Sequence, residues 1–133
     1  MVSKLDNALF FQKQALTLRA NRQQVLAGNI ANADTPHYQA KDFDFTAALH
    51  SAVGGRGAGK LALASTSPGH LQGSAGSGPV RLMYRQAGQP SADGNTVEMD
   101  VERAQFAENA VYYDAGLTFL TLQIKTQLAA LQP

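Results

Sequence analysis

The 133-residue chain contains no cysteine, which excludes disulfide bonds and thiol chemistry. Charged residues make up only 16% of the sequence, and the formal net charge is +1. This balance gives no support for nucleic acid or an acidic membrane surface as a partner. No apolar run is long enough to span a membrane, and the length fits one domain.

The first residues do not resemble a secretory signal peptide. The apolar run 8–11 is short and leads directly into Gln12, Lys13 and Gln14. From this feature alone, the protein is expected to stay in the cytoplasm unless another export system recognises it.

Residues that often carry catalysis are present, but they are scattered. Residues 57–60 come closest to a phosphate-binding loop, and Leu61 stands where that loop needs a hydroxyl residue. The histidines show no spacing typical of metal ligands; they are His37, His50 and His70. We therefore predict no enzyme, no cofactor or metal site, no small-molecule substrate and no nucleic acid binding.

The last third of the chain has the periodicity of a helix that packs along another helix. From residue 99 to 131, apolar residues recur in steps of four and three, interrupted only at Arg103 and Gln127. The predicted pairing residues of this helix are Met99, Phe106, Ala110, Tyr113, Leu117, Leu120, Ile124 and Leu131. Gly116, inside the same helix, is either simply tolerated there or indicates close approach of another backbone.

The partner is a second long helix over residues 5–31, which no proline interrupts. Its apolar face is broader than a single partner needs, so more than one neighbour is expected. Its predicted pairing residues are Leu5, Leu9, Leu16, Leu26 and Ile30. Opposite charges on the first segment and on residues 93–114 would steer pairing, within the chain or between copies, or would simply be solvated.

Several residues predict where the helices begin and end. Asn32 is expected to close the first helix in the left-handed conformation, and Pro36 to hold Thr35 extended. Asp100 is expected to be the N-cap of the last helix. Between them we predict a short helix from about residue 44 to 52, glycine-rich flexible runs, and short strands at 61–63 and 80–85.

The predicted fold is thus mainly α. The long terminal helices pair as an antiparallel coiled-coil-like unit, so that residues 1–34 and 96–133 form one discontinuous helical domain. Residues 35–95 form an extended, flexible, glycine-rich middle segment with the short helix and a possible β-hairpin.

Two segments resemble the flagellar rod and hook family. Residues 29–40 are similar to the signature Ala-Asn-x-x-Thr-Pro-x-Tyr-x-Ala, which closes the first helix in that family. Residues 93–100 and the following helix resemble the proximal-rod members. The motif residues are Asn29, Ala31, Asn32, Thr35, Pro36, Tyr38, Asp93, Gly94 and Asn95. His37 departs from the pattern, since the family usually has glycine there.

The resemblance implies a structural subunit of the bacterial flagellar basal body, which polymerises helically into the proximal rod and transmits torque from the membrane ring. The implied partners are copies of the chain, other rod subunits, the rod-base adaptor and membrane-ring proteins, and the flagellar type III export apparatus. The implied location is the periplasmic rod, reached without a cleaved signal peptide. The surplus apolar face of the first helix is then expected to join neighbouring subunits.

The resemblance also implies an export signal of the form Phe-x-x-x-apolar, which Phe45 and Leu49 fit. The alternative is that these two side chains simply pack one turn apart on a helix. Two alternative functions remain: another proximal-rod subunit, or a two-helix adaptor or chaperone of a type III secretion system that does not polymerise.

Overall fold

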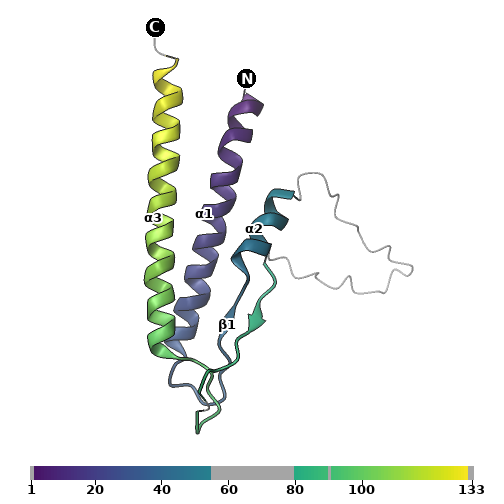
Figure 1. Cartoon of the computed structure of the whole chain (residues 1–133), viewed down its shortest axis with the longest axis vertical. Coiled ribbons are helices and arrows are strands. Elements are labelled where there is room, and N and C mark those ends of the chain that lie inside the picture. The colour runs from purple at the N-terminus through teal and green to yellow at the C-terminus, as the bar shows by residue number, and fades with distance from the viewer. Residues whose placement is uncertain (1, 55–79, 90, 132–133) are drawn as a thin grey trace, which may run out of the picture.

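The computed structural model describes residues 2–54, 80–89 and 91–131, with side chains from residue 6 onward. Two long helices lie side by side with both termini at the same end (Figure 1). The elements in chain order are α1 (Val2–Ala31), β1 (Lys41–Asp42), α2 (Phe45–Gly54), β2 (Met83–Tyr84) and α3 (Met99–Ala129). The predicted mainly α fold with paired terminal helices is confirmed. The division into one discontinuous helical domain, residues 1–34 and 96–133, and a middle segment, residues 35–95, stays a prediction.

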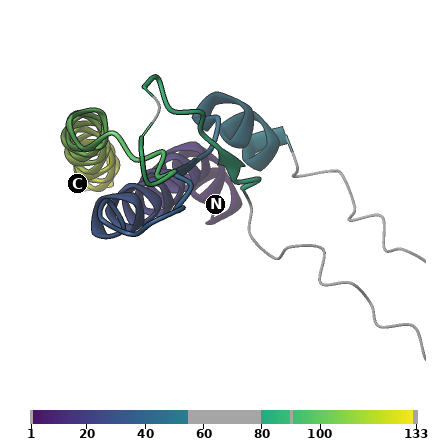
Figure 2. The ribbon, with the colours of Figure 1, turned by 90° about the horizontal axis from the view of Figure 1, so that it is seen from below.

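Among the described residues, helix α1 packs against two helices, α3 and the short α2, and also contacts β1 (Figure 2). Leu18 of α1 is buried together with Phe43 and Ala48, and this cluster is the hydrophobic core. Partly buried residues pack against the cluster; they are Val25, Phe45, Leu49, Ala52 and Val80. The breadth of the apolar face of α1 is therefore explained in part within the chain. Helix α2 covers only part of this face, since apolar α1 residues such as Phe11 stay half exposed. The expectation that the remaining part joins neighbouring subunits stays a prediction.

The two strands pair antiparallel, with Lys41 opposite Tyr84 and Asp42 opposite Met83. A ladder this short is marginal by itself. It is held to α1 by Asn29, whose side-chain amide donates to the carbonyl oxygen of Lys41 at 2.7 Å and accepts from its N–H at 3.0 Å. The strand predicted over residues 80–85 is present only over Met83–Tyr84, and it pairs with β1 in the first half of the middle segment. The other predicted strand, 61–63, lies outside the described residues.

Both predicted helix ends need correction. Asn32 is not left-handed; among the described non-glycine residues that conformation occurs at His37, with φ 59°. The side chain of Asn32 instead donates to the carbonyl oxygen of Gly28 at 2.8 Å, which satisfies the last turn. Helix α3 begins at Met99 with Glu98 as N-cap. Asp100 therefore lies within the first turn, where its charge still favours the helix dipole.

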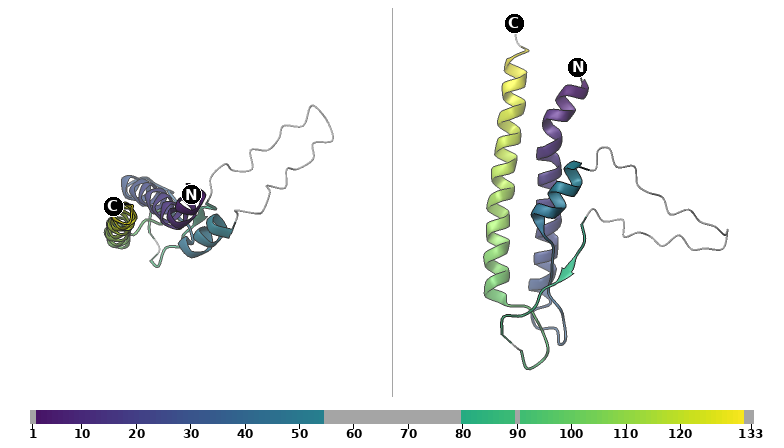
Figure 3. Two further views of the ribbon diagram at one scale, coloured as in Figure 1. Left: turned by 90° about the horizontal axis from the view of Figure 1, so that it is seen from above. Right: turned by 45° about the vertical axis from the view of Figure 1, so that its right-hand side comes forward.

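The upper half of the α1–α3 pair extends beyond α2 (Figure 3). Over this part each long helix packs against the other along one side only, as the view from the side shows. A helix with so few neighbours keeps most of its surface exposed, and this decides where a partner can bind.

Candidate assembly interface

The closed end of the helix pair is organised around Asn29, which is fully buried. Its amide nitrogen donates to Lys41 and, at 3.1 Å, to Glu102 Oε2. Its oxygen accepts from the N–H of Lys41 and, at 3.4 Å, from the hydroxyl of Tyr38. An asparagine side chain has two N–H donors and two acceptor lone pairs, so every hydrogen-bonding position of Asn29 is occupied.

The two sequence motifs meet at this end although they lie about 60 residues apart. The amide nitrogen of Asn95 lies 2.7 to 3.0 Å from the carbonyl oxygens of Asn32, Ala33 and Thr35. The backbone N–H of His37 donates to the carbonyl oxygen of Asp93 at 3.0 Å. The loop after α1 and the loop before α3 are therefore one hydrogen-bonded unit, which sets how the two helices leave it.

Glycine is required at position 94 of this unit. Gly94 has φ 72°, a backbone conformation that side-chain-bearing residues rarely adopt. A Cβ atom there would lie 2.8 Å from Nδ1 of His37. Four of the other motif residues are exposed: Ala31, Thr35, Pro36 and Asp93.

A chain of charges links the middle segment to both long helices through Arg85. Its guanidinium donates to Glu102 Oε1 at 2.7 Å and to Asp42 Oδ2 at 2.7 Å. Arg22 of α1 binds the same carboxylate oxygen of Asp42 at 3.0 Å. The side chain of Glu102 is completely buried, so its charge depends on Arg85 and Asn29 for compensation. The apolar periodicity of α3 did not predict this buried carboxylate.

Three side chains of this end and its surroundings have shifted pKa values. Burial raises the pKa of Asp42, but hydrogen bonds from Arg22 and from the N–H of Phe43, and the charge of Arg22, outweigh burial and lower it. The pKa of exposed Asp93 is lowered by hydrogen bonds, first that from the Ser91 hydroxyl. Burial lowers the pKa of Arg19.

The lowered pKa of Asp42 predicts acid sensitivity. Because the ionised form is favoured in the folded state, its contribution is present above the ordinary aspartate pKa and is lost as the pH falls through the lowered value. We expect Asp42→Asn to be less stable at neutral pH, and to lose less further stability than the parent between about pH 5 and pH 2. Urea unfolding followed by circular dichroism measures both. Asp34→Asn, at an exposed position, should keep the parental pH profile; an Asp42→Asn profile parallel to the parent would contradict the assignment.

Further along the pair, Asn109 of α3 is buried against α1. Its amide nitrogen donates to the carbonyl oxygen of Arg19 at 2.9 Å and to Gln23 Oε1 at 2.6 Å. The guanidinium of Arg19 also lies over two aromatic rings, 3.8 Å from the centroid of Phe45 and 4.5 Å from that of Tyr112. Such stacking joins α1 to both neighbours at once.

The α3 surface that faces α1 is rotated from the predicted one. Its fully buried members are the polar Glu102 and Asn109, seven residues apart and hence on one side of the helix. Leu117, Ile124 and Leu131 are 40%, 39% and 78% exposed, so they do not lie at the centre of the pair. The remaining predicted pairing residues of α3 are partly buried: Met99, Phe106, Ala110, Tyr113 and Leu120.

On α1, Leu26 is fully buried, while Leu9, Leu16 and Ile30 are partly buried. The side chain of Leu5 lies outside the described residues. Leu16 explains Gly116, because a Cβ at that position would lie 2.9 Å from Leu16 Cδ2. The close neighbour of Gly116 is thus a side chain of the same chain, not another backbone.

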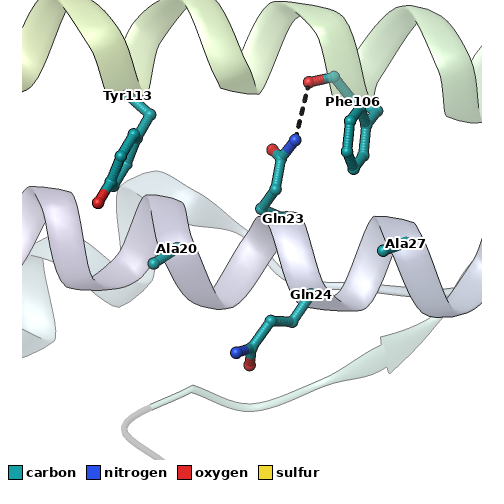
Figure 4. Close-up of a pocket in the computed structure, with 6 residues that line it drawn as sticks. All are labelled: Ala20, Gln23, Gln24, Ala27, Phe106 and Tyr113. Atoms are coloured by element: carbon teal, nitrogen blue, oxygen red, sulfur yellow. Dashed lines mark hydrogen bonds between the residues drawn. The ribbon is translucent and has the colours of Figure 1, made fainter.

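An open apolar groove runs along one side of the helix pair. It consists of two adjoining pockets of about 360 and 440 Å³, which share Ala20 and Tyr113. In the lower pocket, Phe106 and Tyr113 point from α3 toward α1 (Figure 4). Between them Gln23 donates to the carbonyl oxygen of Phe106 at 3.5 Å, and Gln24 points away.

The upper pocket is lined mainly by apolar side chains, and Lys13 is its one charged lining residue. Its apolar side chains are Leu9, Leu16, Ala20, Tyr113, Leu120 and Ile124. The groove therefore presents apolar surface on both helices to whatever lies outside the chain.

Helix α3 also carries large exposed apolar side chains on its remaining sides. They include Val111, Tyr112, Phe119, Leu122 and Leu128, each more than half exposed. A helix that is apolar on several sides is typical of one that is surrounded in its final assembly. Phe45 and Leu49, by contrast, pack against the core, and the ring of Phe45 is covered by Arg19.

No group of three acidic or histidine side chains that could hold a metal ion occurs in the part of the chain that the structure describes. None of the helices, over these same residues, combines the length and apolarity needed to cross a membrane.

Comparison with known proteins bears on this arrangement. A family model described as "Flagella basal body rod protein" matches residues 9–39, which cover most of α1 and the turn after it. The flagellar basal body rod protein FlgB of Salmonella typhimurium is 52% identical over 99% of this chain and 98% of its own length. FlgB of Escherichia coli K12 is 50% identical with the same coverage, and FlgB of Cereibacter sphaeroides is 41% identical over 90% of this chain and 89% of its own length.

Proposed function

Since the chain belongs to the FlgB family of flagellar basal body rod proteins, we propose that it is a rod subunit whose α1–α3 pair associates with copies of itself and with other rod subunits. The observation that carries this proposal is the exposed apolar surface of α3 beside the open groove. Surface of this extent on a chain with few charges is typical of a protein that is covered by neighbours.

The further partners are part of the same proposal. The subunit leaves the cell through the flagellar type III export apparatus, polymerises helically in the periplasm, and meets the rod-base adaptor and membrane-ring proteins at one end. Torque from the ring then passes along the stack. Hydrogen bonds join the two long helices and their loops at the closed end; they are made by Asn29, Asn95 and Arg85. Such a unit resists separation of the helices under torque, which supports a load-bearing role.

Leu120→Asp tests the rod function. Leu120 lines the groove beside α1, so aspartate there puts an unpaired charge into an apolar contact. We expect a strain that carries only this variant to be non-motile in soft agar and to lack assembled rods in basal-body preparations. Thr121→Asp, one residue on and exposed, is the matched control and should swim normally. Normal swimming with Leu120→Asp would count against the pairing surface.

Phe45 and Leu49 remain the proposed export signal. Phe45→Leu keeps an apolar side chain against the core but removes the aromatic ring, so a signal that needs the ring is lost while the fold is retained. We expect the variant to accumulate inside the cell, measured by immunoblot of cell and periplasmic fractions. Phe11→Leu, at a half-exposed position on α1, should be exported normally. If Phe45→Leu is exported as well as the parent protein, Phe45 serves in packing and not as an export signal.

A further inference from the structure

The side of α3 that faces away from α1 carries a continuous uncharged stripe. Its members recur every three or four residues and form one face of the helix; we call the set Ala107, Val111, Ala115, Thr118, Leu122 and Thr126 the outer stripe. Val111 and Leu122 are 68% and 54% exposed. The small residues between them let another backbone approach closely, while these two side chains project as ridges.

The outer stripe and the groove have matching lengths. At ~1.5 Å per residue, the stripe from residue 107 to 126 is about 29 Å long. The groove is lined on α1 from Leu9 to Ala27, which is about 27 Å by the same measure. An apolar helix face that lies in an apolar groove is a common mode of recognition, with anchors spaced three, four and seven residues apart.

Charge also fits a contact between the stripe and the groove. Lys13 is the one charged side chain that lines the upper pocket. Asp114 is exposed on α3 and adjoins the stripe in the helix. In the described residues the ion pairs are Arg22–Asp42, Arg85–Asp42 and Arg85–Glu102, so Lys13 and Asp114 take part in none. They are available to each other across a contact between two copies.

We propose that the outer stripe of α3 of one copy lies in the α1–α3 groove of the next copy. The proposal rests on the proposed function, and it names which two surfaces of the subunit meet. Because the two surfaces differ, each copy still offers one of each after binding. Such a contact propagates and does not close on itself as a symmetric dimer.

The absence of cysteine makes a direct crosslinking test possible. Thr17→Cys places a thiol in the groove, and Ala115→Cys places one on the outer stripe. The two purified variants, with different tags, are mixed under mild oxidation. We expect the mixed disulfide to exceed either self-crosslink several-fold. Ser51→Cys on α2, exposed and remote from both surfaces, is the control and should crosslink only at background level.

Two further variants sharpen the result. Leu122→Asp in the chain that carries Ala115→Cys should lower the mixed crosslink about tenfold or more, since it removes one buried apolar anchor. Lys13→Glu should lower it too, and Asp114→Lys in the other chain should restore it. Parental circular dichroism of each variant shows that the fold is intact.

Four outcomes would overturn the proposal. Self-crosslinking of Ala115→Cys as strong as the mixed product would show a symmetric contact. A mixed product no stronger than the Ser51→Cys control would show no such contact. Flotation with phosphatidylcholine vesicles, abolished by Leu122→Asp, would show that the stripe binds lipid. Normal swimming of a Leu122→Asp strain would reject this contact and leave the rod function standing, whereas a motile deletion strain would reject the rod function itself.

Discussion

Replacing Arg85 with methionine is expected to destabilise the fold by about 3–5 kcal/mol. The guanidinium is the only positive charge that contacts Glu102 among the described residues, and the Glu102 side chain is completely buried. Removing one partner of a buried pair leaves the other charge uncompensated in a low-dielectric site. Asp42 keeps Arg22, so most of the loss arises at Glu102. Chemical unfolding followed by circular dichroism measures the change in the free energy of unfolding.

Two comparisons isolate the cause. Arg81→Met removes a charge from an exposed position four residues earlier and should change stability by less than about 0.5 kcal/mol. Glu102→Gln in the Arg85→Met background removes the unpaired charge, so the double variant should be more stable than Arg85→Met alone. If the double variant is instead less stable, the cost belongs to lost packing of the Arg85 side chain and not to the buried charge.

Replacing Asn95 is expected to open the closed end of the helix pair. Asn95→Ala removes the donors that three carbonyl oxygens share, and an unsatisfied buried carbonyl costs about 1–3 kcal/mol. Asn95→Asp keeps the size but turns an oxygen toward those carbonyls, so it should be the less stable of the two at neutral pH. Amide hydrogen exchange of residues 32–38, together with the unfolding free energy, reports the effect.

Asp34→Asn is the matched control, because it changes an exposed side chain in the same hydrogen-bonded unit. It should retain the slow exchange of the closed end. An Asn95→Asp variant as stable as the parent would mean that the shape of the side chain matters there and its amide donors do not.

The pairing of the terminal helices could be predicted because periodicity is a local property of each segment. Leu26 belongs to the apolar series of α1, and Tyr113 belongs to that of α3. Each series has helical spacing, independent of the rest of the chain. The precise face of α3 could not be predicted in this way. Glu102 and Asn109 are inward-facing because Arg85, Asn29 and Gln23 satisfy them, and those partners come from distant parts of the chain. The seven-residue spacing of Glu102 and Asn109 marks the face of α3 that packs against α1. A search for apolar periodicity overlooks it because both residues are polar.

The small sheet and the helix ends depended on tertiary contacts in the same way. A two-residue strand has no periodicity to detect, and β1 finds its place because Asn29 binds both backbone groups of Lys41. The two motifs were recognisable separately, since each is a local string of turn-forming residues. That Asn95 joins them could be seen only in three dimensions.

The bonds of Arg85 to Asp42 and Glu102 have a consequence for the changes of chain length that the protein can accept. The chain leaves the helical unit after α2 and returns at β2. The core around Ala48 and Leu49 fixes the first point, and the bonds of Arg85 fix the second. Because both points are held by the helical unit itself, we expect that unit to keep its geometry when the number of residues between the two points is changed.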